Sequence, residues 1–140
     1  MSSMTILIPG PCTTVQDEGL IGKRSQGYPL CGVLDKPSTM KANRLLDNRP
    51  FAPVLEIPYG RFSCRVHGET WMAVCGAEVS IYVNGLPVDR TRKIHVQAED
   101  YLTIEPPTQG YRVYLAVKGG FSVPLFLGSA STCLKIHMGG

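Results

Sequence analysis

The chain has 140 residues, of which 44% are hydrophobic and 18% charged, so it is long enough for one globular domain with a buried core. Fourteen Lys and Arg against eleven Asp and Glu leave a net charge of +3, and the basic residues are scattered, which disfavours nucleic acid as a partner. No apolar run approaches the roughly 20 residues that span a bilayer. No basic segment precedes the short apolar start, so we expect no signal peptide, no membrane segment and a cytoplasmic location.

The cysteines and histidines do not follow a metal-binding pattern. No Cys-x-x-Cys pair occurs, and the odd number of five cysteines disfavours a disulfide framework. Neither Cys12 nor Cys31 has a histidine nearby in sequence, which disfavours a cysteine nucleophile. We expect reduced, mostly buried thiols, no metal site, and surface positions for His67, His95 and His137.

A long irregular segment, residues 9–35, follows a short apolar strand that we predict for residues 5–8. The segment contains five glycines and three prolines, which favour turns and disfavour regular elements. Its apolar side chains distinguish it from a flexible linker. We interpret it as an ordered loop that forms a site, rather than as a disordered segment.

One substantial helix is predicted for residues 37–46. Asp35 is suited to cap it and Pro37 to occupy its first turn. Ala42, Leu45 and Leu46 then fall on one face. Pro50 disfavours a helical conformation at the residue before it, so the helix must end ahead of it.

From residue 54 onward the apolar residues recur with a period of two, which predicts β-strands. The alternation covers residues 61–67, 78–83, 93–98, 101–105 and 113–117. Asn84-Gly85, at the end of the strand predicted for residues 78–83, predicts a two-residue hairpin turn. Short strands without βαβ alternation favour an antiparallel barrel or sandwich over a Rossmann-type sheet.

Residues 121–127 are apolar without alternation. Such side chains need cover, so we predict that this segment and part of residues 9–35 form a surface that meets another polypeptide.

Polar residues suited to binding lie in the glycine-rich loop. Gln16, Asp17 and Glu18 precede a glycine, and they suit either a carboxylate for a substrate amine or metal, or a turn whose acids cap backbone amides. Composition alone slightly favours the turn. Lys23 and Arg24 suit a carboxylate or phosphate, but the loop lacks GxxxxGK[ST] and GxGxxG, so no ordinary ATP site is expected in this chain.

Six motifs occur in a recognisable order: PGPCTTVQDEG, GYPLCGVLD, KANRLLDN, VLEI, CGAEV and YRVYLAVKGGFSVPLFLGSAST. Through them the chain resembles the N-terminal half of the biotin-dependent carboxyltransferase, or allophanate hydrolase subunit 2, family. That family includes the C subunit of 5-oxoprolinase, the carboxyltransferase domain of urea amidolyase and the Kip-type antagonist. The resemblance implies a mainly β, antiparallel, cyclophilin-like β-barrel over residues 1–140, with one short helix and a long glycine-rich loop.

The resemblance also implies a substrate cleft beside that loop. Its expected catalytic residues are Gln16 and Asp17. Its expected substrate-binding residues are Thr13, Thr14, Lys23, Arg24 and Asp35.

Three positions depart from the family pattern. Leu20 and Ala130 stand where the family usually has arginine, and Cys31 stands where it has serine. Loss of two cations removes charge-assisted contacts to an anionic substrate. Lys23, Arg24 and Arg112 are the candidates to compensate.

The first functional interpretation is part of a subunit of an ATP-dependent amide-cleaving enzyme of 5-oxoprolinase type, which opens 5-oxoproline to glutamate. The chain is expected to bind no cofactor and to be inactive alone. The implied partners are a missing C-terminal half or a second copy of the chain, a kinase-inhibitor-like companion subunit with which ATP is handled, and a small lactam or amide substrate.

Two alternatives remain open. One is a carboxyltransferase half that takes carboxybiotin and a urea-like amide. The other is a non-catalytic binding module for a kinase-inhibitor-like partner.

Overall fold

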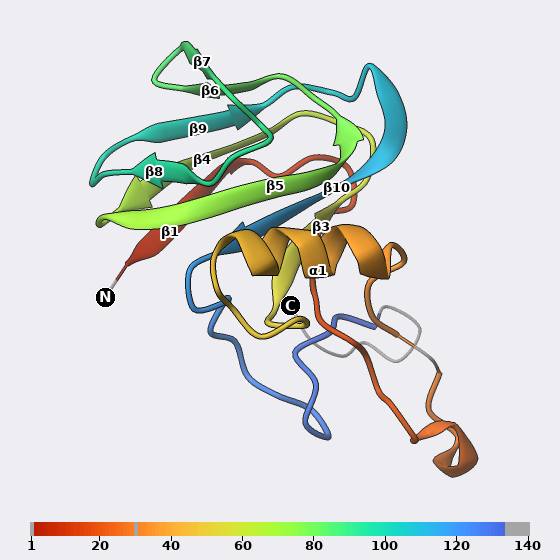
Figure 1. Cartoon of the computed structure of the whole chain (residues 1–140). Helices are drawn as coiled ribbons and strands as arrows, with labels where there is room; N and C mark the ends of the chain where they lie inside the picture. Colours follow the sequence, from red (N-terminus) through yellow and green to blue (C-terminus); the bar gives the residue numbers. More distant parts are fainter. Residues whose placement is uncertain (1, 30, 134–140) are drawn as a thin grey trace.

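A computed structural model describes residues 2–29 and 31–133 of the chain. These residues form two antiparallel five-stranded β-sheets and one α-helix, arranged in layers (Figure 1). The prediction of a mainly β, antiparallel fold with one helix is confirmed. No helix in the described ranges has the length and apolar character needed to cross a membrane.

The first sheet has the strand order β1-β4-β9-β6-β7, and the second has the order β2-β3-β10-β5-β8. The strands of the first sheet are β1 (Ser3–Ile8), β4 (Phe62–His67), β9 (Tyr101–Ile104), β6 (Ile81–Val83) and β7 (Leu86–Val88). Those of the second are β2 (Thr14–Gln16), β3 (Val54–Ile57), β10 (Gln109–Val117), β5 (Thr70–Glu78) and β8 (Ile94–Val96). The strand pairings recorded between described residues do not join the two sheets, so the closed cyclophilin-like barrel stays a prediction.

The main core lies between the sheets, where inward side chains of alternating strands meet. Phe62, Cys64 and Val66 on β4 are all at most 1% exposed, as their period-two pattern predicted. The hairpin turn is also confirmed, because Asn84 and Gly85 join β6 to β7 with φ values of 52° and 80°.

Strands β6 and β8 are shorter than their patterns predicted. β6 covers only Ile81–Val83 of the predicted residues 78–83. The alternation in residues 93–98 placed Ala98 inward, but Ala98 is exposed because β8 ends at Val96. The Asp100 carboxylate accepts a hydrogen bond from the backbone N–H of Gln97 at 2.8 Å. This contact stabilises a turn, and the turn overrides the apolar pattern.

Helix α1 (Lys36–Leu45) covers the outer face of the second sheet (Figure 1). A second apolar cluster fills the space between them and contains Val33, Ala42, Leu46, Val54, Ala73, Cys75, Tyr114 and Ala116. The predicted helix and its cap are confirmed, since the Asp35 carboxylate accepts from the Ser38 N–H at 3.0 Å and from its hydroxyl at 2.6 Å.

Substitution of this cap gives a first testable expectation. Asp35→Ala should lower the free energy of unfolding by about 1 kcal/mol, because the helix loses an acceptor for its first-turn N–H groups. Urea unfolding of this variant beside Lys36→Ala, an exposed neighbour, measures the effect. Equal midpoints for the two variants would contradict the capping role.

The prediction that residues 9–35 contain no regular element is wrong in two places. β2 occupies Thr14–Gln16, and a single 3₁₀ turn, η1, occupies Arg24–Gln26. Three residues are too few for periodicity to reveal. β2 is a strand because it pairs antiparallel with β3, a partner distant in sequence.

The described residues between Asp17 and Val33, 18–29 and 31–32, belong to an Ω-loop, a compact loop whose two ends meet. At its neck the Val33 N–H donates to the Asp17 carbonyl oxygen at 3.0 Å. At this neck the two backbone segments lie very close together at Gly19 and Gly32. A Cβ on Gly19 would lie 1.9 Å from the Cys31 carbonyl oxygen. The loop is therefore ordered by backbone contact at its base.

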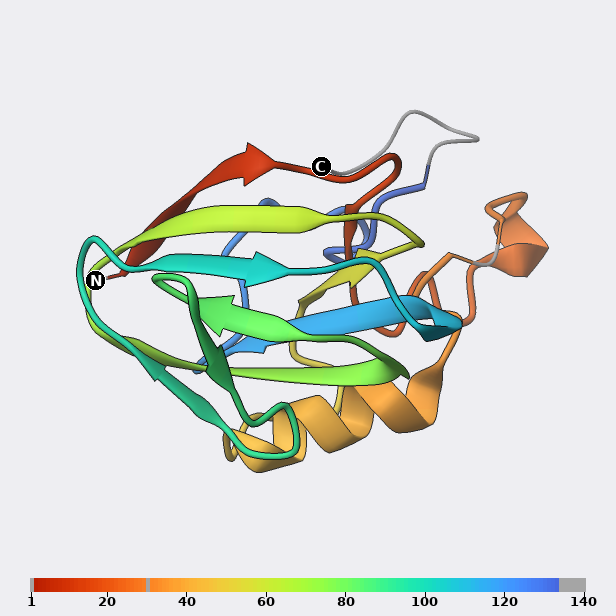
Figure 2. The ribbon, with the colours of Figure 1, turned by 90° about the horizontal axis from the view of Figure 1, so that it is seen from above.

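The Ω-loop projects from the layered body (Figures 1 and 2), and residues 121–129 form a second projection in the view of Figure 1. Tyr28 of the first and Phe126 of the second meet edge to face, with ring centroids 5.7 Å apart. Leu125, Phe126 and Leu127 are 65%, 39% and 45% exposed. The predicted apolar segment thus lies at the surface, next to the loop with which its sequence pattern had grouped it.

Candidate functional site

A pocket of about 280 Å³ lies where β1, the edge strand of the first sheet, approaches β2, the edge strand of the second. Its wall is mostly apolar, with three threonines. The residues that line it are Ile6, Pro9, Thr13, Thr14, Val15, Leu55, Phe62 and Thr132. Among these described lining residues none is charged.

The segment of residues 129–133 closes one side of this site by lying along β2. The Thr132 N–H donates to the Val15 carbonyl oxygen at 2.9 Å. The Asp17 N–H donates to the Ser131 hydroxyl oxygen at 2.9 Å. β2 and residues 129–133, which are far apart in sequence, thereby form one wall of the pocket.

The Asp17 carboxylate joins the Ω-loop neck to this segment. Its Oδ1 accepts from the Gly19 N–H at 2.8 Å and from the hydroxyls of Ser129 and Ser131, each at 2.7 Å. Its Oδ2 accepts from the Ala130 N–H at 2.8 Å. Four donors on one carboxylate hold two chain segments in a fixed relation.

These contacts also set the acidity of Asp17. Burial raises the pKa of the carboxyl, but the hydrogen bonds from Ser129, Ala130, Ser131 and Gly19 outweigh burial, and the pKa is lowered overall. A carboxylate stabilised in its charged form is a weak base at neutral pH. The geometry therefore favours a positioning role for Asp17, while its expected catalytic role stays a prediction.

Gln16 connects two residues of the pocket wall. Its Nε2 donates to the Thr14 hydroxyl oxygen at 2.9 Å and to the Thr132 carbonyl oxygen at 3.0 Å. The side chain is held, and the residue is only 7% exposed. Its catalytic role also stays a prediction.

Three buried polar atoms around this site have no hydrogen-bond partner in the described part of the protein: Thr13 Oγ1, Thr132 Oγ1 and Gln16 Oε1. A buried polar atom without a partner costs about 1–3 kcal/mol. A hydroxyl can donate and accept, whereas a carboxamide oxygen only accepts. Thr13 and Thr132 line the pocket, so their two hydroxyls are suited to a small ligand that offers both kinds of hydrogen-bonding group.

The structure brings together only part of the predicted substrate-binding set. Thr13 and Thr14 line the pocket. Lys23 and Arg24 lie at the η1 turn of the Ω-loop, and Asp35 caps α1, so these three are outside the pocket lining.

Two of the departures from the family pattern lie in buried surroundings. Leu20 and Ala130 are each 1% exposed, and Leu20 packs with Cys133, Tyr28 and Cys31. Their side chains carry no charge, so they offer no charged contact to an anion.

Sequence reasoning missed the contributions of Ser129, Ser131 and Thr132. All three belong to the GSAST motif, of which the sequence-based prediction used only the alanine. The hydrogen bonds from the two serines to Asp17 span 112 and 114 residues in sequence, a separation that no periodicity reports.

A buried carboxylate in the VLEI motif was also missed. Glu56 Oε2 accepts from the Leu34 N–H at 2.9 Å and from the Tyr114 hydroxyl at 2.7 Å. The Tyr114 hydroxyl oxygen in turn accepts from the Asp35 N–H at 2.9 Å. Burial, followed by the bond to Glu56, raises the pKa of Tyr114, so Tyr114 stays protonated. The pair fixes the chain between the Ω-loop and α1.

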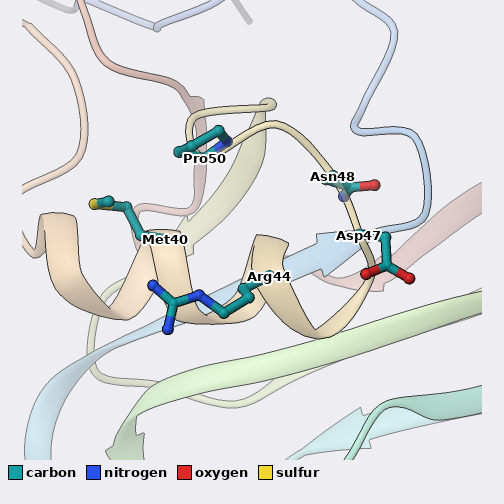
Figure 3. Close-up of a pocket in the computed structure, with 5 residues that line it drawn as sticks. All are labelled: Met40, Arg44, Asp47, Asn48 and Pro50. Atoms are coloured by element: carbon teal, nitrogen blue, oxygen red, sulfur yellow. The ribbon is translucent and has the colours of Figure 1, made fainter.

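A second hollow, of about 290 Å³, lies at the C-terminal end of α1 (Figure 3). Figure 3 shows the charged groups of Arg44 and Asp47 well apart rather than converging. The Asn48 amide is already engaged, because it donates to Asn43 Oδ1 at 3.0 Å and to the Val117 carbonyl oxygen at 2.8 Å. This hollow is a feature of the helix end and not a second site.

The described histidines and most of the thiols are placed as expected, whereas Cys12 is exposed and Cys31 is half-buried. Cys64, Cys75 and Cys133 are buried free thiols, and burial raises the pKa of Cys64 to about 12. His67 and His95 lie at the surface, and His137 lies outside the described residues. Within the described ranges no group of three or more His, Cys, Asp or Glu side chains could hold a metal ion.

Comparisons with known proteins show which proteins this chain resembles. A family model described as "Carboxyltransferase domain, subdomain A and B" matches residues 26–140. The C subunit of 5-oxoprolinase from Escherichia coli is 39% identical over 137 residues, which are 98% of this chain and 44% of that protein. Urea amidolyase of Lachancea kluyveri is 38% identical over 133 residues, which are 94% of this chain and 7% of that protein.

A solved structure also resembles this chain. The crystal structure of the K. lactis urea amidolyase matches with a TM-score of 0.88 and 38% identity, covering 92% of this chain and 8% of that one. The chain thus spans less than half the length of the curated relatives named here. With the family model matching most of its residues, the chain belongs to the carboxyltransferase domain family, subdomains A and B.

Proposed function

We propose that this chain is part of a subunit of an ATP-dependent amide-cleaving enzyme of 5-oxoprolinase type, in which it supplies one wall of the substrate cleft. The observation that carries the proposal is the presence of two unpartnered buried hydroxyls, Thr13 Oγ1 and Thr132 Oγ1, on described residues that line one pocket. The similarity to the C subunit of 5-oxoprolinase supports the reaction class.

The pocket chemistry suits an amide. A threonine hydroxyl that donates to an amide carbonyl oxygen polarises the carbonyl, and it stabilises negative charge that develops on that oxygen during cleavage. Gln16 keeps Thr14 and Thr132 in place through its Nε2, and Asp17 anchors the neighbouring serines. In this proposal Thr13 and Thr132 contact the substrate, while Asp17 positions the wall.

The nucleotide does not fit this pocket. A triphosphate needs cations or a nest of backbone N–H groups, and none of the described lining residues is charged. ATP is therefore assigned, within the proposal, to a kinase-inhibitor-like companion subunit.

A second candidate is a carboxyltransferase half that acts with carboxybiotin on a urea-like amide. The similarity to urea amidolyase, in sequence and in structure, favours it. The biotinyl group would come from a separate carrier. A third candidate, a non-catalytic binding module, draws support from the uncharged Leu20 and Ala130.

Ligand binding tests the first proposal directly. 5-Oxoproline titrated into the chain should shift NMR signals of Thr13 and Thr132, and Thr13→Val or Thr132→Val should weaken binding about five- to tenfold, because each removes one hydrogen bond. Thr132→Ser should keep the affinity, and the exposed Thr108→Val is the control. Unchanged affinity in both valine variants would refute the assignment.

A reconstitution assay distinguishes the candidates. The chain alone should release no glutamate from 5-oxoproline and ATP. The chain with a C-terminal half and the companion subunit should release it. Turnover of urea with carboxybiotin, and not of 5-oxoproline, would favour the second candidate, and no turnover of either would favour the third.

The exposed apolar residues 125–127 lead to a separate prediction about association. Full burial of an exposed side chain is worth roughly 1.5–3 kcal/mol, and Leu125, Phe126 and Leu127, which are 65%, 39% and 45% exposed, would each gain about half of that in an interface, so the chain should associate with a C-terminal half or with a second copy. Phe126→Asp should weaken that association. Sedimentation of both proteins, with and without the C-terminal half, measures it, and Leu86→Asp, 70% exposed on β7, is the control. A monomeric wild type that ignores the partner would contradict the prediction.

A further inference from the structure

We infer that the pocket between β1 and β2 takes the uncharged amide edge of its ligand and leaves any carboxylate of that ligand outside. The inference rests on the proposed function and names the part of the substrate that this wall recognises. It predicts that lactams without a carboxylate are ligands too.

Charge decides which end of the ligand enters. The described lining residues include no Lys, Arg or His. Arg61 follows β3 and precedes Phe62 of the pocket wall, but its guanidinium is already paired with Glu105 at 2.8 Å. A carboxylate buried among Ile6, Leu55 and Phe62 would lose its hydration without gaining a counter-ion, which is strongly unfavourable.

The unpartnered atoms decide what the entering end must carry. Thr13 and Thr132 line the pocket, and their Oγ1 atoms, unpartnered among the described residues, can each donate to a carbonyl oxygen or accept from an N–H. A lactam presents its C=O and N–H side by side on one edge, so one hydroxyl can donate to its carbonyl oxygen while the other accepts from its N–H.

The remaining wall suits the body of a small ring. Ile6, Val15, Leu55 and Phe62 present apolar side chains to the pocket, and ring methylene groups gain from burial against them. A volume of about 280 Å³ is at the small end for ligand pockets. The pocket therefore selects compact cyclic or short amides rather than extended ones.

A ligand series tests this inference on the chain itself. The probes are 5-oxoproline, 2-pyrrolidinone, which lacks the carboxylate, N-methyl-2-pyrrolidinone, which lacks the N–H, and L-proline, which lacks the amide. NMR titration should give dissociation constants for the first two within about threefold of each other. N-methylation should weaken binding about tenfold or more, and L-proline should cause no shift at the pocket.

Variants of Thr132 test whether the lactams bind in this pocket. Thr132→Val should weaken both 5-oxoproline and 2-pyrrolidinone by similar factors, and Thr132→Ser should restore both, which keeps the test valid if the valine variant folds poorly. Strong binding of 5-oxoproline with 2-pyrrolidinone bound more than about thirtyfold more weakly would overturn the inference and leave the proposed function standing. Absence of pocket shifts with either lactam would overturn both.

Discussion

Replacement of Gly19 by alanine is expected to lower the free energy of unfolding by roughly 3 kcal/mol or more, a larger effect than most single substitutions produce. The added Cβ would lie 1.9 Å from the Cys31 carbonyl oxygen and 2.6 Å from its carbonyl carbon. Both are backbone atoms, which cannot swing aside like the end of a side chain. The φ of Gly19, +101°, adds strain that an L residue rarely tolerates.

Gly19→Ala should open the neck of the Ω-loop. The Ω-loop would lose its closing contact between Asp17 and Val33, and limited proteolysis should cut within residues 18–32 faster than in the wild type. Gly22→Ala is the matched control, because Gly22 has a positive φ of 74° but no atom within 4 Å of the added Cβ, so its cost should be about 1 kcal/mol. Similar denaturation midpoints for the two variants would show that the neck contact contributes little.

Asp17→Asn is expected to lower the free energy of unfolding by roughly 2 kcal/mol at neutral pH. The asparagine keeps the shape of the side chain but removes its charge, and its NH₂ group would face a donor if it took the place of Oδ2 opposite the Ala130 N–H. The half-buried position of Asp17 lets solvent screen part of the loss. Glu18→Gln, an exposed neighbouring carboxylate, is the control.

The contribution of the Asp17 charge to stability should depend on pH in a defined direction. The folded pKa of Asp17 is lowered, so its contribution to stability is present above the unfolded pKa of about 3.9 and is lost as the pH falls towards the folded value. The stability difference between wild type and Asp17→Asn should therefore be full at pH 7 and shrink below about pH 4. A difference that stays constant down to about pH 2 would show that the charge is not the stabilising feature.

Local features of the fold were predictable from the sequence because their causes are local. The turn at Asn84-Gly85 needs only two residues that tolerate positive φ. The Asp35 cap acts on an N–H three residues away. Strand β4 alternates because one of its faces is buried. The turn and the cap are determined by neighbours in the chain, and the alternation of β4 is visible within six consecutive residues.

The candidate site was only partly predictable because its contacts are long-range. The threonines of the loop were identified, but Thr132 and the serines that bind Asp17 come from the far end of the chain. β2 is too short to show a period. Roles for Gln16 and Asp17 in catalysis remain predictions.

The bonds between Asp17 and residues 129–131 have a consequence for the time course of folding. Contacts of such high sequence separation carry a larger loop-closure entropy than local turns and hairpins, so we expect them to form after those turns. During synthesis the glycine-rich loop leaves the ribosome long before its partner segment exists. Because Thr132 lines the pocket and pairs with Val15, the pocket wall is complete only once residues 129–133 lie along β2, and we expect ligand binding in a refolding experiment to report the docking of this segment.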